Sequence, residues 1–204
     1  QEFVEKSISS KAMQVVVDFN VIDQVHLYNS EVTGQFLIKA EGDSRIPDFA
    51  LNEKQGVVYI RGNDIDYDKE TLELDKVCSI EPNYTSYQIF VPSDKELYMS
   101  IVEGNFYADG FNGELNLKVE DGIVQLSHCS DPVRVKLNTG SIFVQGYENS
   151  DVDAKTNLGM LIADPWVKHI SDDKKQLVHR FGNGRNQLKI RTIMANIFLN
   201  GSED

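Results

Sequence analysis

The most chemically suggestive stretch of the sequence is an acidic segment between positions 64 and 75. Its carboxylates recur at alternate positions, and one more follows at the twelfth: Asp64, Asp66, Asp68, Glu70 and Asp75. This spacing imitates the odd-numbered oxygen ligands of a calcium loop. Such a loop has glycine at its sixth position and a bidentate glutamate at its twelfth, where this sequence has Lys69 and Asp75. A solvated acidic loop explains the segment better, and we assign no metal and no cofactor.

Histidine and cysteine provide no catalytic pair. The histidines are scattered without His-x-x-x-His spacing, and no serine or cysteine stands in a nucleophile elbow. These histidines are His26, His128, His169 and His179. His128 and Cys129 are adjacent, and adjacent residues of a strand face opposite ways. The two cysteines, Cys78 and Cys129, match no metal-ligand spacing. Buried thiols and a Cys78–Cys129 disulfide both stay open, with thiols the commoner arrangement.

Basic residues recur at a regular spacing in the second half of the chain. They are Lys118, Lys136, Lys155 and Arg191. The overall composition is acidic, with 20 Lys and Arg against 32 Asp and Glu and a formal charge of −12. That balance disfavours nucleic acid and anionic membranes as partners, because both bind cationic surfaces. No apolar stretch approaches the roughly 20 residues of a membrane span, and Gln1 to Lys6 is no signal segment. We therefore expect a soluble mature chain whose signal segment has been removed.

An 18-residue repeat must position these residues. Its anchors are Gly104, Gly122, Gly140, Gly159 and Ala195. Seven residues before the anchors lie Leu97, Leu115, Val133, Val152 and Leu188; two residues after them lie Phe106, Val124, Ile142, Leu161 and Ile197. Other apolar offsets alternate by two, which is the period of a strand. Each repeat therefore holds two strands that bend near the glycine.

The fixed offsets predict an all-β chain whose second half is a β-solenoid with 18-residue coils. Residues 93–204 form the regular coils, with an insertion at 168–187 that reads as a loop or a short helix. Residues 1–92 are strand-rich but keep no 18-residue register, and we expect irregular β coils there that cap the solenoid. A β-sandwich is the alternative, but a sandwich does not require one set of offsets over five units.

The repeat also carries a family resemblance. Its motifs are Tyr87-Gln-Ile-Phe-Val-Pro92, then Leu97-Tyr-Met-Ser-Ile101, and the closing stretch Gly182 to Thr192. Over about residues 13–204 the chain resembles the bacterial β-solenoid family called "putative adhesin", together with the auto-transporter adhesin head GIN domain. The resemblance implies a secreted or envelope location and no established catalytic residues. Ala195 in place of glycine and a long excursion after Gly62 depart from the pattern.

Two outward-facing columns are candidates for binding. Four residues before the anchors, the four basic residues form a ladder that is either a solvated face or a groove for an acidic glycan or for carboxylates of a partner. The second column is apolar and is joined by neighbours on the same sheet: Ile123, Phe143, Met160, Ile162 and Phe198. Either the N-terminal half or the insertion covers this face, or it is an interaction surface for a partner or a homo-oligomer.

These patterns favour a non-enzymatic extracytoplasmic binding or structural module whose ligand is a glycan or a protein. The alternative is a carbohydrate-active β-helix enzyme that acts on an acidic polysaccharide. Such an enzyme needs clustered acids on one sheet face, and the aspartates of the repeat form no single column. Those aspartates are Asp109, Asp121, Asp131, Asp153 and Asp164.

Overall fold

The computed structural model describes residues 2–42, 48–62, 85–130, 132–147, 150–164, 170–180 and 187–200. Within these ranges every regular element is a strand, so the predicted all-β class is confirmed. The N-terminal strands are β1 (Glu2–Ser9), β2 (Gln14–Asn29), β3 (Gln35–Gly42), β4 (Phe49–Lys54), β5 (Val57–Gly62) and β6 (Thr85–Val91). The remaining strands are β7 (Glu96–Asp109), β8 (Glu114–Ser127), β9 (Val133–Gln145), β10 (Asp151–Thr156), β11 (Leu161–Ala163), β12 (Gln176–His179), β13 (Gln187–Thr192) and β14 (Asn196–Asn200).

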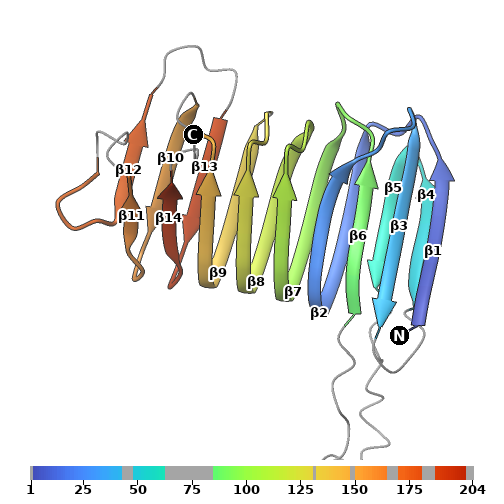
Figure 1. Ribbon diagram of the computed structural model, residues 1–204, viewed down its shortest axis with the longest axis horizontal. Helices are drawn as coiled ribbons and strands as arrows, with labels where there is room; N and C mark the ends of the chain where they lie inside the picture. The colour runs from blue at the N-terminus through green and yellow to red at the C-terminus, as the bar shows by residue number, and fades with distance from the viewer. Residues whose placement is uncertain are drawn as a thin grey trace, which may run out of the picture.

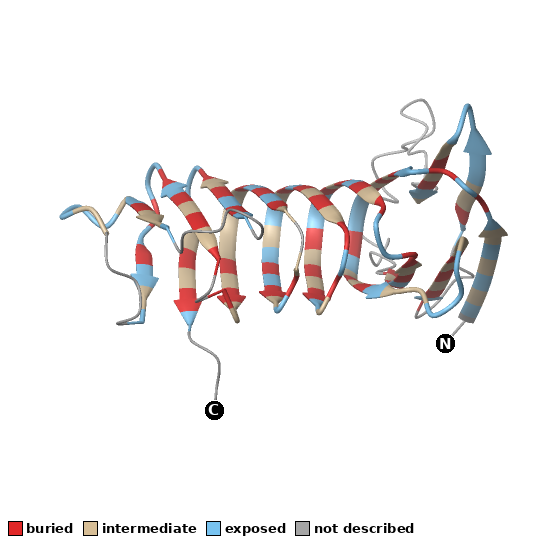
Figure 2. Cartoon of the chain, turned by 90° about the horizontal axis from the view of Figure 1, so that it is seen from above, coloured by how far each residue is buried: buried red, intermediate tan, exposed pale blue. Residues whose placement is uncertain are grey.

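All of these strands belong to one mixed sheet. In the described ranges its pairing runs from β1 at one end to β12 at the other without returning to its start. The strands stand side by side in a row along the long axis of the molecule (Figure 1). Buried and exposed residues alternate along them (Figure 2). This alternation follows from the period of two in the sequence, because successive side chains of a strand point to opposite faces.

The central strands β7, β8 and β9 pair in parallel at the spacing of the repeat. Leu97 lies opposite Leu115, and Leu115 lies opposite Val133. The buried side chains of β7 include Leu97 and Ile101 before the glycine and Phe106 after it. Equivalent residues of neighbouring strands therefore stack into buried columns, with about 4.8 Å between successive members of a column.

A column of glycines lets these strands approach one another where they bend. Gly140 has a φ of 125°. A Cβ atom placed on it would lie 1.8 Å from the carbonyl oxygen of Gly122, and one on Gly122 would lie 1.9 Å from that of Gly104. Each position is thus occupied by the backbone of the preceding strand, so a residue with a side chain does not fit.

The N-terminal half contains both parallel and antiparallel strands and continues the sheet of β7, β8 and β9. β2 pairs in parallel with β7, with Val15 opposite Leu97 and Val25 opposite Phe106. On its other edge β2 pairs in parallel with β5 and β6, where Val15 meets Val58 and Val25 meets Tyr87. Three pairs of strands in this half are antiparallel: β3 with β6, β1 with β3, and β4 with β5. The sequence showed no 18-residue register here, and the segments that pair are far apart along the chain.

The C-terminal strands are stacked in a different order from their order in the chain. Leu188 of β13 lies opposite both Val133 of β9 and Val152 of β10, so β13 is inserted between them. A stack in chain order would place Val152 directly on Val133, but β13 separates the two. The described part of the 168–187 insertion contains β12, which pairs antiparallel with β10, rather than a helix. Because the insertion carries the chain past β10, the last strands can return to the edge of β9.

A buried thiol lies at the corner after β8. Cys129 is 4% exposed, and its Sγ atom donates a hydrogen bond to the carbonyl oxygen of Ser127 at 3.5 Å. Removal from water raises the pKa of the Cys129 thiol and that of the buried Tyr147 hydroxyl. Phe111, Cys129 and Tyr147 are all buried, as expected of groups that fill the interior at this corner. Cys78, its candidate disulfide partner, lies outside the described residues.

We expect Cys129 to react slowly with thiol reagents in the folded protein. The thiolate is the reactive form, and each unit of raised pKa lowers its fraction about tenfold. In a Cys78→Ser background at pH 8, labelling of the native chain should be at least about tenfold slower than labelling in urea. Equal rates in the two conditions would contradict the burial of Cys129.

Candidate binding surfaces

The structure brings the four predicted basic residues together on adjacent strands. Lys118 of β8 lies opposite Lys136 of β9, Lys136 lies opposite Arg191 of β13, and Arg191 lies opposite Lys155 of β10. Arg191 thus stands between Lys136 and Lys155 rather than at the end of the ladder, because β13 separates β9 from β10. Neighbouring members are about one strand spacing, 4.8 Å, apart.

Two of the four have anionic partners. Lys118 forms an ion pair with Glu120 at 2.5 Å, and Arg191 forms one with Asp153 at 2.7 Å. Arg191 also donates a hydrogen bond to the backbone carbonyl oxygen of Asp153 at 3.0 Å. Within the described part of the chain, Lys136 and Lys155 have no ion pair, and both are exposed. Their ammonium groups are therefore available to a ligand.

Two further cations on the same face escaped the sequence analysis. Lys189 lies opposite Arg134, and each precedes a member of the ladder by two residues, which places all of them on one face of the sheet. Arg134 forms an ion pair with Glu114. The other members of this column are Tyr98, Asn116 and Asp153, so the column has no common residue type that the sequence could have revealed.

We call this surface the cationic face. Its members are Lys118, Arg134, Lys136, Lys155, Lys189 and Arg191. The strands β9, β13 and β10 contribute five of these cations, and the carboxylates on the outward side of the same strands are Asp151 and Asp153. A local excess of positive charge therefore lies on a protein whose formal net charge is −12.

The predicted apolar residues also share one outward face, formed by the second halves of β7, β8 and β9 together with β14 and β11. The pairing places Tyr107, Gln125, Phe143, Phe198 and Ile162 in one row across the sheet. The Phe143 and Phe198 rings stack with centroids 4.8 Å apart. Ile123, Met160 and Ile162 are 40%, 51% and 44% exposed.

No described segment covers these exposed side chains. The strand of the insertion, β12, extends the other part of the sheet by pairing with β10. A hollow of about 350 Å³ lies on the face, and its lining mixes Tyr107, Ile123 and Phe143 with the amides of Gln125, Gln145 and Asn200. A contact role for this face stays a prediction.

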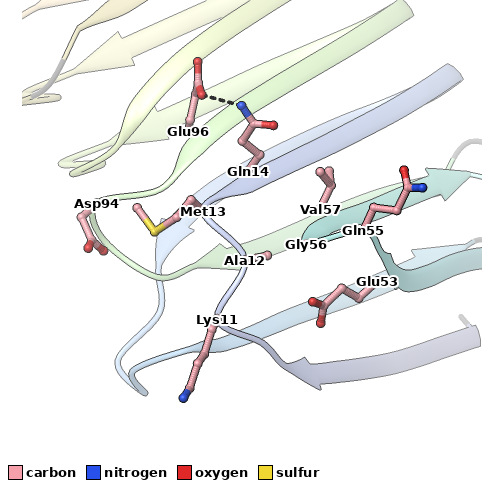
Figure 3. Close-up of a pocket in the computed structure, with 10 residues that line it drawn as sticks. All are labelled: Lys11, Ala12, Met13, Gln14, Glu53, Gln55, Gly56, Val57, Asp94 and Glu96. Atoms are coloured by element: carbon pink, nitrogen blue, oxygen red, sulfur yellow. Dashed lines mark hydrogen bonds between the residues drawn. The ribbon is translucent and has the colours of Figure 1, made fainter.

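Another hollow, of about 560 Å³, lies at a corner near β2, β4 and β7 (Figure 3). The Glu96 carboxylate there accepts hydrogen bonds from Tyr98 and, at 3.0 Å, from Gln14, and these bonds hold its pKa below the usual range. The side chains of Glu53, Asp94 and Glu96 point in different directions (Figure 3). They do not face one another as the two carboxylates of a glycosidase do.

The structure also bears on metal binding by the residues that it describes. No group of three or more His, Cys, Asp or Glu side chains could hold a metal ion there. The acidic segment 64–75, Asp131 and His169 lie outside the described residues. The comparison of that segment with a calcium loop is therefore not tested. The searched part also contains no helix long and apolar enough to cross a membrane.

Comparison with known proteins finds a solved structure of similar fold. No family model matches the chain, and no curated protein matches it. Among solved structures, the chain is similar to a "putative cell adhesion protein" from Clostridium sporogenes, with 16% identity, a TM-score of 0.71 and coverage of 98% of this chain and 99% of that one. At this identity the likeness shows a shared fold.

Weaker likenesses point to proteins of the same description. A "putative adhesin" from Bacteroides fragilis is 9% identical, has a TM-score of 0.40 and covers 98% of this chain and 97% of its own. Another from Parabacteroides merdae is 12% identical, has a TM-score of 0.31 and covers 98% and 77%. These two scores are too low to carry an argument.

Proposed function

We propose that the chain is a non-enzymatic, adhesin-like binding module that acts outside the cytoplasm. The observation that carries the proposal is the cationic face, where exposed side chains of one charge repeat from strand to strand on an open surface. Such a surface can bind an extended ligand at several points at once. It does not enclose a small substrate or bring acid and base together, as catalysis requires.

The fold supports this proposal. We infer that the parallel strands wind as a β-solenoid, because pairs 18 residues apart bury one face on both sides of each glycine bend. A rigid stack of this kind holds the outward rows at a constant spacing. Preorganised rows reduce the entropic cost of binding a long ligand. The likeness of the fold to that of the "putative cell adhesion protein" from Clostridium sporogenes is consistent with this role.

A ligand screen combined with a turnover assay tests the proposal. We expect the protein to bind at least one class of surface glycan or protein on an array and to leave every bound polysaccharide uncleaved. Antibody labelling of intact source cells tests the location. Cleavage of a polysaccharide that a single Asp or Glu substitution abolishes would overturn the non-enzymatic proposal.

A further inference from the structure

The centre of the cationic face is a compact grid on the strands β9, β13 and β10. One row reads Lys136, Arg191, Lys155, and the row beside it reads Arg134, Lys189, Asp153. Within a row, neighbours are about 4.8 Å apart. The described part of the chain offers Lys136, Lys155 and Lys189 no ion pair, and all three are exposed.

The two arginines of the grid are held in place by the protein itself. Arg191 donates to both the carboxylate and the backbone carbonyl of Asp153, at 2.7 Å and 3.0 Å. Arg134 is bound by Glu114 and lies 3.3 Å from Asn116 Oδ1. These contacts neutralise part of the charge of each arginine and hold both arginine side chains in place beside the lysines. The three lysines are therefore the groups with free charge.

The run of positive charge has defined ends. Beyond Lys118, the next residues across the sheet are Ser100 and then Asp18. Beyond Lys155 the next residue is Gln176 of β12. The main row is thus four strands wide, and the uncharged residues Ser100 and Gln176 stand at its two ends.

We propose that the cationic face binds a linear polysaccharide that carries one carboxylate on each sugar unit. The chain would lie across the strands, along the long axis of the molecule, with successive carboxylates near Lys118, Lys136, Arg191 and Lys155. Lys189 would contact the same chain from the neighbouring row. This inference rests on the proposed binding function and names the class of its ligand.

The charge density of the face favours such a polymer over nucleic acid. Double-stranded DNA carries one charge per about 1.7 Å of its axis, whereas the row offers one cation per strand, about 4.8 Å. A sugar unit is close in length to the strand spacing, so the spacing of carboxylates along a polyuronate is compatible with the spacing of the cations across the strands. A densely charged nucleic acid would also meet repulsion from the rest of a chain with 32 acidic residues.

Each contact with an exposed lysine is weak, so affinity must come from several contacts. Two consequences are measurable. Affinity should rise with the length of the polymer up to about four units, the width of the row, and level off beyond it. Binding should also weaken steeply as salt rises, because exposed charges are screened within about 8 Å at physiological ionic strength.

Oligogalacturonates of one to eight units are suitable probes, measured by calorimetry at about 20 mM and about 150 mM salt. Fully methyl-esterified oligomers keep the sugar chain and remove its charge. We expect binding by the acidic oligomers at low salt, with the plateau near four units, and none by the esters. A lack of binding by any acidic oligomer, or equal binding by the esters, would overturn the inference.

Two matched variants separate this face from the net charge of the protein. Lys136→Glu with Lys155→Glu reverses two free lysines of the row, and we expect at least about a tenfold loss of affinity. Lys11→Glu with Lys54→Glu makes the same change in net charge at exposed lysines away from the face, and it should keep affinity within about twofold. Equal losses in both variants, no loss in the first, or tighter binding of a DNA duplex than of the octamer would each contradict the inference. Binding of another ligand on the array would still leave the proposed function standing.

Discussion

Replacing Gly140 with alanine should destabilise the protein by about 3 to 6 kcal/mol. The φ of 125° is one that residues with a side chain rarely adopt, which costs about 1 to 3 kcal/mol. The new Cβ atom would also lie 1.8 Å from the carbonyl oxygen of Gly122, so β8 and β9 must move apart. Against a typical stability of about 5 to 15 kcal/mol this is a large loss. Urea unfolding followed by circular dichroism measures it.

Gly110 offers a matched control for this substitution. It has a φ of 64°, and a Cβ atom placed on it would meet nothing within 4 Å. Gly110→Ala therefore carries the backbone cost alone, about 1 to 2 kcal/mol. Similar losses in the two variants would mean that the strands do not approach as closely at Gly140 as the structure shows.

Leu137→Asp should also be strongly destabilising. Leu137 is 1% exposed and lies in the buried column between Val119 and Thr192. An unpaired carboxylate at this position would cost several kcal/mol, or would have to take up a proton to avoid that cost. We expect the variant to be unfolded at neutral pH in a thermal melt. Acidification toward pH 4 should recover part of the loss, because protonation removes the buried charge.

Lys136→Asp is the control for the Leu137 variant. It introduces the same residue one position earlier, on the exposed side of β9. Its loss should stay within about 1 kcal/mol, since surface substitutions away from special features have small effects. If Lys136→Asp unfolded the chain and Leu137→Asp did not, the assignment of inward and outward positions would be reversed.

Much of the candidate site could be predicted from the sequence because the chain repeats locally. Lys118 and Lys136 belong to consecutive repeats, so the offset of 18 residues placed them on neighbouring strands. Arg191 and Lys155 were assigned to the correct column, but their order across the sheet differs from their order in the chain. Arg134 and Lys189 were missed, because the column that holds them also contains tyrosine, asparagine and aspartate.

The apolar outer face was likewise predicted only in part from the sequence. Its residues were identified from their offsets, and the structure confirms that they lie on one side of the sheet. Whether another segment covered them could not be deduced, since covering depends on the path of β12 and of the N-terminal strands. β12 extends the edge of β10 instead, which leaves Ile162 44% exposed.

The sequence by itself determined the strand periodicity, the inward residues and the glycine bends, because each depends on residues within one repeat. Only the tertiary structure decided which strands are neighbours. Val15 meets Leu97, and Leu188 lies between Val133 and Val152, although long stretches of chain separate them. Parallel pairing requires the chain to cross over between strands. The length of a crossover does not determine beside which strand the next one pairs. The grid of cations on β9, β13 and β10 exists because β13 returned between the other two.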